Sequence, residues 1–405
     1  MIPLMDDIQA DMNVLVGDLA TLSNRPAIAW EPMRLAFLAD LSRSLLKHPL
    51  CKTMADVTTF AYWIRKANLQ TLKDRFTSDA GMQVGVGVTF HICPSNVAVN
   101  FAYSLVFGLL AGNTCVLRLA TKETPVDRLI VEAIRDVLSQ AMYQDLKDAI
   151  LLMRYERNEK LNAYWLGQAD GRVIWGGDET VNHMRRYQTP PRSREITFAD
   201  RYSFCALKPD AVLACSEEDL LKICQKLFYD IYLMDQAACS SPQLIVWVGE
   251  QDKIRAAKEK LWSLFYSFCQ TQYEITPIQV MNKFSQICVN ASEYDAIDQV
   301  VSHDNLLYRS QLNDVKNGLE HYRGYAGAVL EASLSHLSEM EKVVTQTYQT
   351  MTYFGFEQVE LEDFMRTSRV RGIDRIVPIG QAVDMDIIWD GYEIISSLSR
   401  LVDIR

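Results

Sequence analysis

The sequence lacks an excess of basic residues. Its 405 residues include 41 lysines and arginines against 51 aspartates and glutamates, so the formal net charge is −10 at neutral pH. A surface that binds nucleic acid needs an excess of basic side chains to neutralise phosphates, and the composition therefore predicts no nucleic-acid partner. Glycine and proline, at 18 and 12 residues, are not enriched, so long disordered tails are not expected.

Long hydrophobic runs are missing as well. No apolar run approaches the roughly 20 residues that a helix needs to span a bilayer, and the sequence predicts no membrane span. The first residues, MIPLMDDIQADM, have neither the cationic start nor the apolar centre of a secretory signal. We therefore expect a cytoplasmic protein.

Paired cysteines at metal-site spacing are also absent. The nine cysteines are an odd number, and no two of them form a CxxC motif. The pairs His91/Cys93 and His48/Cys51 have no second pair downstream at the spacing of a zinc site. We expect no metal, and we expect thiols that mostly pack as small hydrophobic side chains.

The periodicity predicts an α/β protein with more than one domain, because 405 residues exceed one ordinary core. Apolar residues in the first part of the chain fall on single helical faces. The run VGVGVTFHI (84–92) alternates and predicts one β-strand, which the segment CPSN (93–96) interrupts. A buried helix is then expected over 97–112, a strand over 114–119, and a helix that begins with Thr124, Pro125 and Asp127. Together these elements predict a parallel βαβ unit.

Strands and helices continue to alternate beyond this unit. Further strands are expected at 149–155, 172–177, 243–248, 285–291, 350–356 and 375–380. The segment WDGYEIISSLSRLV (389–402) predicts a closing helix preceded by an Asp-Gly turn. The most natural domain boundary lies near Arg201, where a strand-like segment ends.

Two glycine-containing segments are candidates for phosphate binding. The glycines of VGVGV lie inside the strand, whereas a dinucleotide motif needs them in the following turn, so close backbone packing explains them better. In WGGDE, Gly176 and Gly177 follow a strand and precede a helix, where backbone N–H groups can bind an anion. An ordinary tight turn is the alternative.

Four arginines, at 185, 186, 192 and 194, are concentrated in HMRRYQTPPRSR. A solvated loop is one explanation. The other is recognition of a phosphate group on a cofactor or thioester carrier.

Cys239 is the candidate nucleophile. In MDQAACSSPQ it has small neighbours, which leave room for a substrate carbon, and an asparagine amide such as that of Asn96 can donate to an oxyanion. A packed core thiol is the alternative. A Cys–His dyad is a rival arrangement, although none of the six histidines lies in a recognisable signature.

From residue 84 to the C-terminus, nine motifs in order resemble the LuxC family of bacterial long-chain acyl-CoA reductases, within the aldehyde dehydrogenase superfamily. The motifs are PSN (94–96), LAGN (110–113), VLR (116–118) followed by TP (124–125), WGGDE (175–179), FADRYS (198–203), DQAACSSPQ (235–243), QTMTYFG (349–355), DRIVPIG (374–380) and WDGYE (389–393).

The resemblance implies an α/β, aldehyde dehydrogenase-like fold, with a Rossmann-type cofactor domain and an α/β catalytic domain. The expected parts are the helical N-terminal part of the cofactor domain (1–83), the NAD(P)-binding domain (84–201), the catalytic domain with the nucleophilic cysteine (202–388) and the closing helix (389–405).

The resemblance also assigns site residues. Cys239 falls at the acyl-accepting cysteine and Asn96 at the oxyanion-hole asparagine. The implied cofactor-binding residues are Cys93, Pro94, Ser95, Arg118, Gly176 and Gly177. Arg118 stands where most aldehyde dehydrogenases have a lysine, and an arginine there suits a 2′-phosphate, so NADPH is the expected cofactor and NADH the alternative.

One departure concerns hydrolysis. Aldehyde dehydrogenases carry a glutamate that activates water, and Phe198 occupies its place here, with Glu195 and Asp200 as possible substitutes. A missing base suits an enzyme that releases aldehyde. The expected function is reduction of an acyl thioester to an aldehyde through an acyl-cysteine intermediate.

The expected partners are an acyl thioester on CoA or a carrier protein, an acyl-protein synthetase-like protein and a second copy in a homodimer. Two alternatives to the reductase are a cysteine acyltransferase or thioesterase without a redox step, and an inactive relative that serves as an assembly subunit.

Overall fold

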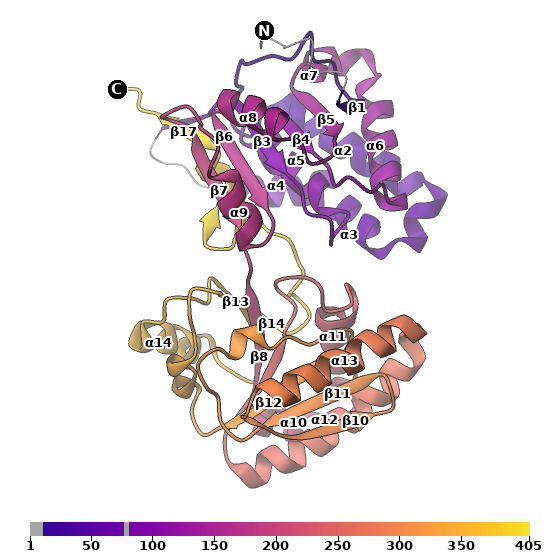
Figure 1. Ribbon diagram of the computed structural model, residues 1–405, viewed down its shortest axis with the longest axis vertical. Helices are drawn as coiled ribbons and strands as arrows, with labels where there is room; N and C mark the ends of the chain where they lie inside the picture. Colours follow the sequence, from indigo (N-terminus) through magenta and orange to yellow (C-terminus); the bar gives the residue numbers. More distant parts are fainter. Residues whose placement is uncertain (1–10, 77–80) are drawn as a thin grey trace. The chain divides into compact units, whose positions relative to one another are not determined.

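The computed structural model describes residues 11–76 and 81–405, and the parts of the helical prediction on residues 1–10 and 77–80 lie outside it. The chain forms two compact units (Figure 1). Unit 1 comprises residues up to Ala199 together with Met385–Arg405, and unit 2 comprises Asp200–Asp384. Among the described helices, none is both long and apolar enough to cross a membrane.

Unit 1 contains helices and strands from both ends of the chain. Its helices are α2 (Pro32–Lys47), η1 (Pro49–Thr53), α3 (Ala55–Trp63), α4 (Lys66–Arg75), α5 (Asn100–Leu110), α6 (Pro125–Leu138), η2 (Ala141–Tyr143), α7 (Gln144–Lys147), α8 (Glu159–Gln168), α9 (Asp178–Met184) and α15 (Ile394–Ser397). Its strands are β1 (Asn13–Val16), β2 (Met82–Gly85), β3 (Val88–Ile92), β4 (Thr114–Arg118), β5 (Ile150–Arg154), β6 (Gly171–Trp175), β7 (Arg194–Phe198), β15 (Ile388–Trp389), β16 (Tyr392–Glu393) and β17 (Ser399–Val402).

The central sheet of unit 1 has the strand order β1-β5-β4-β3-β6-β7, and only β1 is antiparallel to its neighbour. The chain runs from β3 through β4 to β5 on one side and returns to β6 and β7 on the other. Strand order therefore reverses between β3 and β6, the position where open α/β sheets bind ligands.

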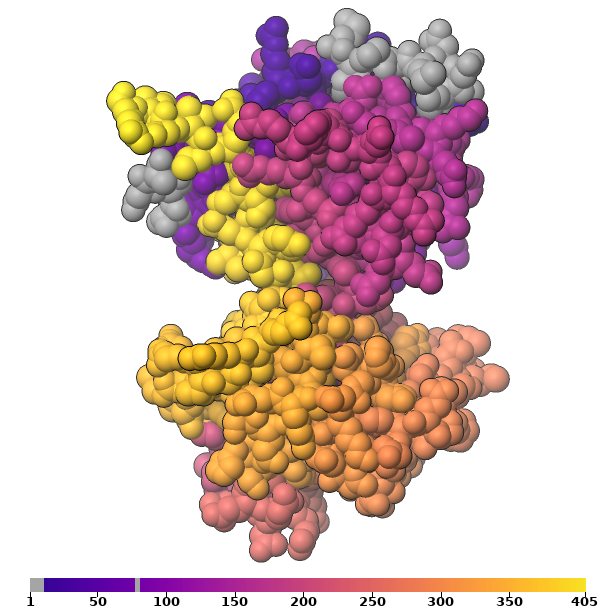
Figure 2. Space-filling view, turned by 60° about the vertical axis from the view of Figure 1, so that its left-hand side comes forward, coloured from indigo at the N-terminus to yellow at the C-terminus, as the bar shows by residue number. Residues whose placement is uncertain are grey.

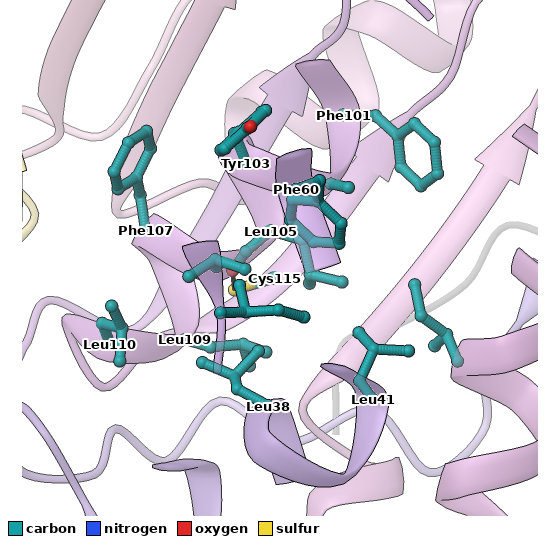
Figure 3. Close-up of a cluster of buried hydrophobic side chains, with 14 of the residues drawn as sticks. Leu38, Leu41, Phe60, Phe101, Tyr103, Leu105, Phe107, Leu109, Leu110 and Cys115 are labelled. Atoms are coloured by element: carbon teal, nitrogen blue, oxygen red, sulfur yellow. Dashed lines mark hydrogen bonds between the residues drawn. The ribbon is translucent and has the colours of Figure 1, made fainter. Parts of the chain in front are cut away.

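Helices cover both faces of this sheet. The largest hydrophobic cluster joins α2, α3, α5 and α6, and Figure 3 shows Leu38, Leu41 and Phe60 beside the apolar side chains of α5. A second cluster joins α8 and α9 to alternate residues of β3, β4 and β5. Nearly the whole of α5 is buried, which confirms the buried helix expected at 97–112.

Local sequence signals explain the next helix of unit 1. Thr124 Oγ1 accepts the N–H of Asp127 at 3.1 Å, and Asp127 Oδ2 accepts the N–H of Thr124 at 3.2 Å. Pro125 occupies the first helical turn. This capping box confirms the predicted start of α6.

The single strand predicted over 84–92 is wrong. Gly87 has φ 137°, and this turn separates β2, which pairs with β17, from β3 in the central sheet. A side chain at Gly85 would collide with the carbonyl of Gly112, and one at Gly87 with Asp170. Close packing, and not a phosphate, therefore accounts for the glycines of VGVGV, as expected.

The predicted closing helix at 389–405 is also wrong. Asp390 and Gly391 both have positive φ and connect β15 to β16, which pair antiparallel. Only Ile394–Ser397 are helical, and β17 then pairs antiparallel with β2. Figure 2 shows these C-terminal residues in yellow against the magenta part of the same unit.

Unit 2 is a second α/β layer. Its helices are α10 (Pro209–Ala214), α11 (Glu217–Tyr232), α12 (Gln251–Gln272), α13 (Pro277–Glu293), η3 (Leu319–His321), η4 (Leu337–Lys342) and α14 (Gln358–Ser368). Its strands are β8 (Tyr202–Leu207), β9 (Leu244–Val248), β10 (Ile297–His303), β11 (Leu307–Leu312), β12 (Ala328–Leu334), β13 (Tyr348–Phe354) and β14 (Arg375–Pro378).

The sheet of unit 2 has the order β10-β11-β12-β9-β8-β13-β14, and only β10 is antiparallel to its neighbour. The strand predicted at 285–291 is wrong, because these residues belong to α13. Thr276 and Gln279 form a capping box with Pro277 in the first turn, so the helix start lies well before the segment that suggested a strand.

Candidate functional site

The candidate cofactor residues of unit 1 lie at one edge of its sheet. Parallel strands β4, β3 and β6 are neighbours, with Ile92 in register with Arg118 and with Ile174. Arg118 ends β4, CPSN follows β3, and the two glycines follow β6. Parallel pairing therefore brings Arg118, CPSN and Gly176-Gly177 to the edge where strand order reverses.

Arg118 lines a cavity of about 540 Å³ with residues of α8, α9 and the loop after β5. Its guanidinium carbon lies 4.7 Å from the ring centre of Tyr155, and Nη2 donates to the carbonyl of Tyr155 at 3.4 Å. Its buried Nε has no hydrogen-bond partner among the described residues. Arg157 and Arg186 line the same cavity, and Glu179 is its one acidic residue. The charged side chains of the wall are thus mostly basic.

The arginine-rich segment 183–194 does not act as one cluster. Of its four arginines, only Arg186 is among the residues that line the cavity. Arg185 pairs with Glu195 at 2.7 Å, and Arg194 donates to the carbonyl oxygens of Ser396 and Ser397 in the C-terminal segment. One arginine is therefore available for an anion, and two stabilise the fold.

Cys93, Pro94 and Ser95 line a different, much smaller hollow of about 10 Å³, with Lys122 and the start of α6. Ser95 and Asn96 are exposed. Burial raises the pKa of the Cys93 thiol far above its usual range, which disfavours a thiolate there. The structure thus brings Arg118 to the larger cavity and places Cys93, Pro94 and Ser95 at the smaller one.

A row of hydrogen-bonded, buried polar side chains connects the elements next to this edge of the sheet. Ser104 Oγ accepts from Trp175 Nε1 at 2.9 Å and lies 2.7 Å from His91 Nδ1, while His91 Nε2 lies 2.9 Å from Thr89 Oγ1. Desolvation lowers the pKa of His91 to about 3, so this histidine is neutral. These hydrogen-bonded side chains form a structural link between β3, α5 and β6.

Phe198 is buried at the end of β7 and stacks on Trp175, with ring centres 3.6 Å apart. It has no group that could activate water. Glu195, one of the two possible substitutes, pairs with Arg172 at 2.5 Å and with Arg185. These two cations hold the Glu195 carboxylate in a structural role.

In unit 2, Cys239 lies on a short loop that two glutamines hold in place. Gln236 is buried with φ 63°, and its Nε2 donates to the carbonyl oxygens of Pro242 at 2.9 Å and Ala328 at 3.0 Å. Gln243 Nε2 donates to the carbonyl oxygen of Gln236 at 3.1 Å. A left-handed residue this well bonded is held by its surroundings, so these hydrogen bonds define the path of the loop that contains the sulfur.

Two strand residues contact Cys239 directly. Ser203 in β8 donates to its carbonyl oxygen at 2.7 Å, and Gln349 Nε2 in β13 donates to its Sγ at 3.5 Å. The sulfur therefore lies at the amino ends of neighbouring strands β8, β9 and β13.

Cys239 differs from most other thiols of the chain in its surroundings. Burial raises the pKa of six of them, which are Cys93, Cys115, Cys205, Cys215, Cys224 and Cys269. Cys239 is partly accessible and has an amide donor at its sulfur. A partly accessible cysteine whose sulfur has an N–H donor suits nucleophilic attack on a carbonyl.

Sequence reasoning singled out Cys239 as the candidate nucleophile and did not single out the residues that hold its loop. Ser203, Gln236, Gln243 and Gln349 all lie within the motifs that carried the family resemblance. Their presence in these motifs was the only feature of the sequence that could have marked them as candidate site residues. Their roles depend on strand order, which the sequence does not specify.

Comparisons with known proteins agree with this architecture. The model of a family described as acyl-CoA reductase (LuxC) matches residues 38–314. A long-chain acyl-protein thioester reductase of Photorhabdus laumondii is 21% identical over 307 residues, which cover 73% of this chain and 58% of that protein. One of Aliivibrio fischeri is 22% identical over 165 residues, which cover 40% of this chain and 32% of that protein. The match thus spans less than two thirds of either relative.

Among solved structures, an NAD-dependent benzaldehyde dehydrogenase from Corynebacterium glutamicum is similar, with a TM-score of 0.61 and 13% identity. The similarity covers 92% of this chain and 85% of that one. The chain therefore has the aldehyde dehydrogenase fold, which confirms the fold class expected from the sequence.

Proposed function

Since this chain belongs to the acyl-CoA reductase (LuxC) family, we propose that it reduces an acyl thioester to an aldehyde, with the acyl group carried on Cys239 and NADPH as the reductant. The observation that carries the proposal is the setting of Cys239. Cys239 is a partly accessible residue, its sulfur accepts an amide N–H at 3.5 Å, and it lies on a loop held by buried glutamines.

The chain's own residues perform the acyl transfer. The Cys239 thiolate attacks the thioester carbonyl carbon, a new C–S bond forms, and the bond to the leaving thiol breaks with its electron pair. The leaving thiolate then takes up a proton. The backbone N–H of Cys239 and the amide of Asn96 are the proposed donors to the oxyanion. Phe198 in place of a carboxylate disfavours hydrolysis of the acyl-enzyme, because it cannot activate water.

NADPH, when bound, supplies the hydride that reduces the acyl carbonyl. The cavity beside Arg118 suits such a cofactor, because three arginines and the unpartnered Nε of Arg118 provide donors for phosphate groups. Arg118, Arg157 and Arg186 are the proposed ligands of the cofactor's phosphates. Gly176 and Gly177 would allow close approach of its pyrophosphate.

Other parts of the proposal follow from the resemblance. Cys93, Pro94 and Ser95 are proposed to contact the cofactor beside Asn96. The substrate is an acyl group on CoA or a carrier protein, delivered with the help of an acyl-protein synthetase-like partner, and a homodimer is the expected assembly. We also propose a cytoplasmic location.

The test is covalent labelling without cofactor. The protein is incubated with radiolabelled acyl-CoAs of increasing chain length in the absence of NADPH, digested and mapped. The expected adduct lies on the peptide that contains Cys239 and is lost in Cys239→Ser. Cys288→Ser, which removes an exposed thiol, should keep the adduct.

A second measurement separates the reductase from a cysteine acyltransferase or thioesterase. Thioester-dependent loss of NADPH absorbance is expected only from the reductase. An adduct on Cys239 without NADPH oxidation would favour the transferase, and label elsewhere with an unmodified Cys239 would reject both.

A further inference from the structure

Beside the Cys239 loop, strand β13 has one residue more than the stretch of β8 with which it pairs. Its register with β8 shifts between Tyr348 and Met351. These two residues pack in the same hydrophobic cluster, although residues three apart in a regular strand point to opposite faces. The strand therefore bulges at Gln349 and Thr350. Such bulges are typical next to active sites, where they re-aim a side chain.

The bulge directs the amide of Gln349 at the Cys239 sulfur, with Nε2 3.5 Å from Sγ. Gln349 is only 1% exposed. Thr350 Oγ1 donates to its Oε1 at 3.4 Å, and the N–H of Thr350 donates to the buried hydroxyl of Ser203 at 3.1 Å. The side chain and the backbone of the bulge are thus both tied down, and the donor is oriented before any substrate arrives.

We propose that Gln349 is a catalytic residue that stabilises the thiolate of Cys239, an inference that rests on Cys239 being the nucleophile of the proposed function. A hydrogen bond to a charged acceptor is roughly twice as strong as one to a neutral acceptor. An N–H at the sulfur therefore favours the thiolate over the thiol. A glutamine amide does not titrate, so this support is independent of pH.

The same N–H serves two stages of the reaction. Before attack it stabilises the negative charge on sulfur. In the acyl-enzyme the sulfur is neutral and accepts the hydrogen bond from Gln349 more weakly. When the aldehyde leaves, the C–S bond breaks, its electron pair returns to sulfur, and the N–H again meets a thiolate. Gln349 thereby improves Cys239 both as a nucleophile and as a leaving group.

Alkylation tests this inference without substrate or cofactor. The rate of modification of Cys239 by iodoacetamide is measured against pH by peptide mass spectrometry. The protein is compared with Gln349→Met, which keeps the volume and removes the donor, and with Gln349→Glu, which replaces the amide by a carboxylate. The pH midpoint is expected to rise by about one unit in Gln349→Met. It should rise further in Gln349→Glu, because a like charge opposes the thiolate.

Two other thiols serve as internal controls. Cys288 is exposed on α13, and its alkylation profile should stay unchanged. Cys205 is buried in unit 2, so its protection shows that a variant is folded. If one variant loses that protection, the other decides the test. An unchanged Cys239 midpoint in a folded variant would overturn the role of Gln349.

The measurement also separates this inference from the proposed function. A shifted midpoint in a protein that forms no acyl adduct would uphold the donor role and reject the reductase. An acyl adduct on Cys239 with an unshifted midpoint would reject the donor role of Gln349 and keep Cys239 as the acylated nucleophile.

Discussion

Ser203 Oγ donates a hydrogen bond of 2.7 Å to the carbonyl oxygen of Cys239. Ser203 Oγ in turn accepts the backbone N–H of Thr350 at 3.1 Å, and Ser203 is fully buried. The Ser203 hydroxyl in β8 thus connects two segments, the loop that contains Cys239 and the bulge in β13. Without the Ser203 hydroxyl, the part-buried carbonyl of Cys239 and the buried N–H of Thr350 lose this hydrogen-bond partner.

Ser203→Ala should lower the free energy of unfolding by about 2–3 kcal/mol, because unsatisfied buried polar groups are costly. Acylation of Cys239 should also slow, since the loop loses one of its supports. Urea unfolding and the labelling rate check the two effects. Ser302→Ala, exposed on edge strand β10, should change unfolding by less than about 0.5 kcal/mol. Equal stability of the two variants would contradict the role of the Ser203 hydroxyl.

Arg118→Ala should weaken NADPH binding by about tenfold or more and NADH binding much less, because charge-assisted contacts to a 2′-phosphate are lost. The measurement is titration of nicotinamide fluorescence, which needs no turnover. Arg185→Ala is the matched control, since Arg185 pairs with Glu195 and does not line the cavity. An equal loss for both cofactors would show that Arg118 contacts a part that they share.

Glu331 in unit 2 is a buried carboxylate with several donors. Trp247 Nε1 donates to it at 2.9 Å, Trp262 Nε1 at 2.7 Å and Arg309 Nη1 at 2.9 Å. Glu331→Gln should cost roughly 3–5 kcal/mol in urea unfolding, since Arg309 would be left as an uncompensated buried charge. Glu259→Gln, on the exposed face of α12, should have little effect. A loss below about 1 kcal/mol for Glu331→Gln would show that water reaches Arg309.

The buried, neutral state of His91 predicts that the free energy of unfolding falls in acid. Its pKa is lowered from 6.5 to about 3 by desolvation, so the unfolded chain binds a proton that the folded chain does not. The stabilising contribution of neutral His91 is complete above pH 6.5 and is lost as the pH falls towards 3. Between pH 7 and pH 4 this should cost about 3 kcal/mol.

Urea unfolding across this pH range checks the prediction. His91→Gln should show a flatter dependence than the unaltered protein, whatever its stability at pH 7. His321→Asn, which changes an exposed histidine, should keep the original slope. An unchanged slope in His91→Gln would contradict the buried neutral state.

Elements with strong local signals were predictable from the sequence. The Thr124 capping box, the buried run of α5 and the apolar strand β9 each specify their structure within about a dozen residues. The strand expected at 285–291 failed because a β-branched, apolar stretch was weighed without the Thr276 capping box that begins α13. The strand expected at 84–92 failed because the left-handed turn at Gly87 divides the alternation between two sheets.

For the candidate site, the sequence allowed a prediction of the nucleophile's residue type but not of the side chains that surround it. Small neighbours and the family resemblance singled out Cys239. Gln349 lies 110 positions away along the chain, and it reaches the sulfur only through the pairing of β13 with β8 and a one-residue bulge. Strand order and register are long-range properties, so no local pattern could place Gln349 at the nucleophile.

The pairing of β17 with β2 bears on how the chain folds as it leaves the ribosome. Asn113 Nδ2 donates to the carbonyl oxygen of Leu398, and Arg194 to those of Ser396 and Ser397. Unit 1 therefore needs residues that are synthesised after all of unit 2. Unit 2 is contiguous and can fold first. Until residues 399–402 emerge, the edge of β2 that pairs with β17 lacks its partner strand, and its backbone N–H and C=O groups stay unpaired.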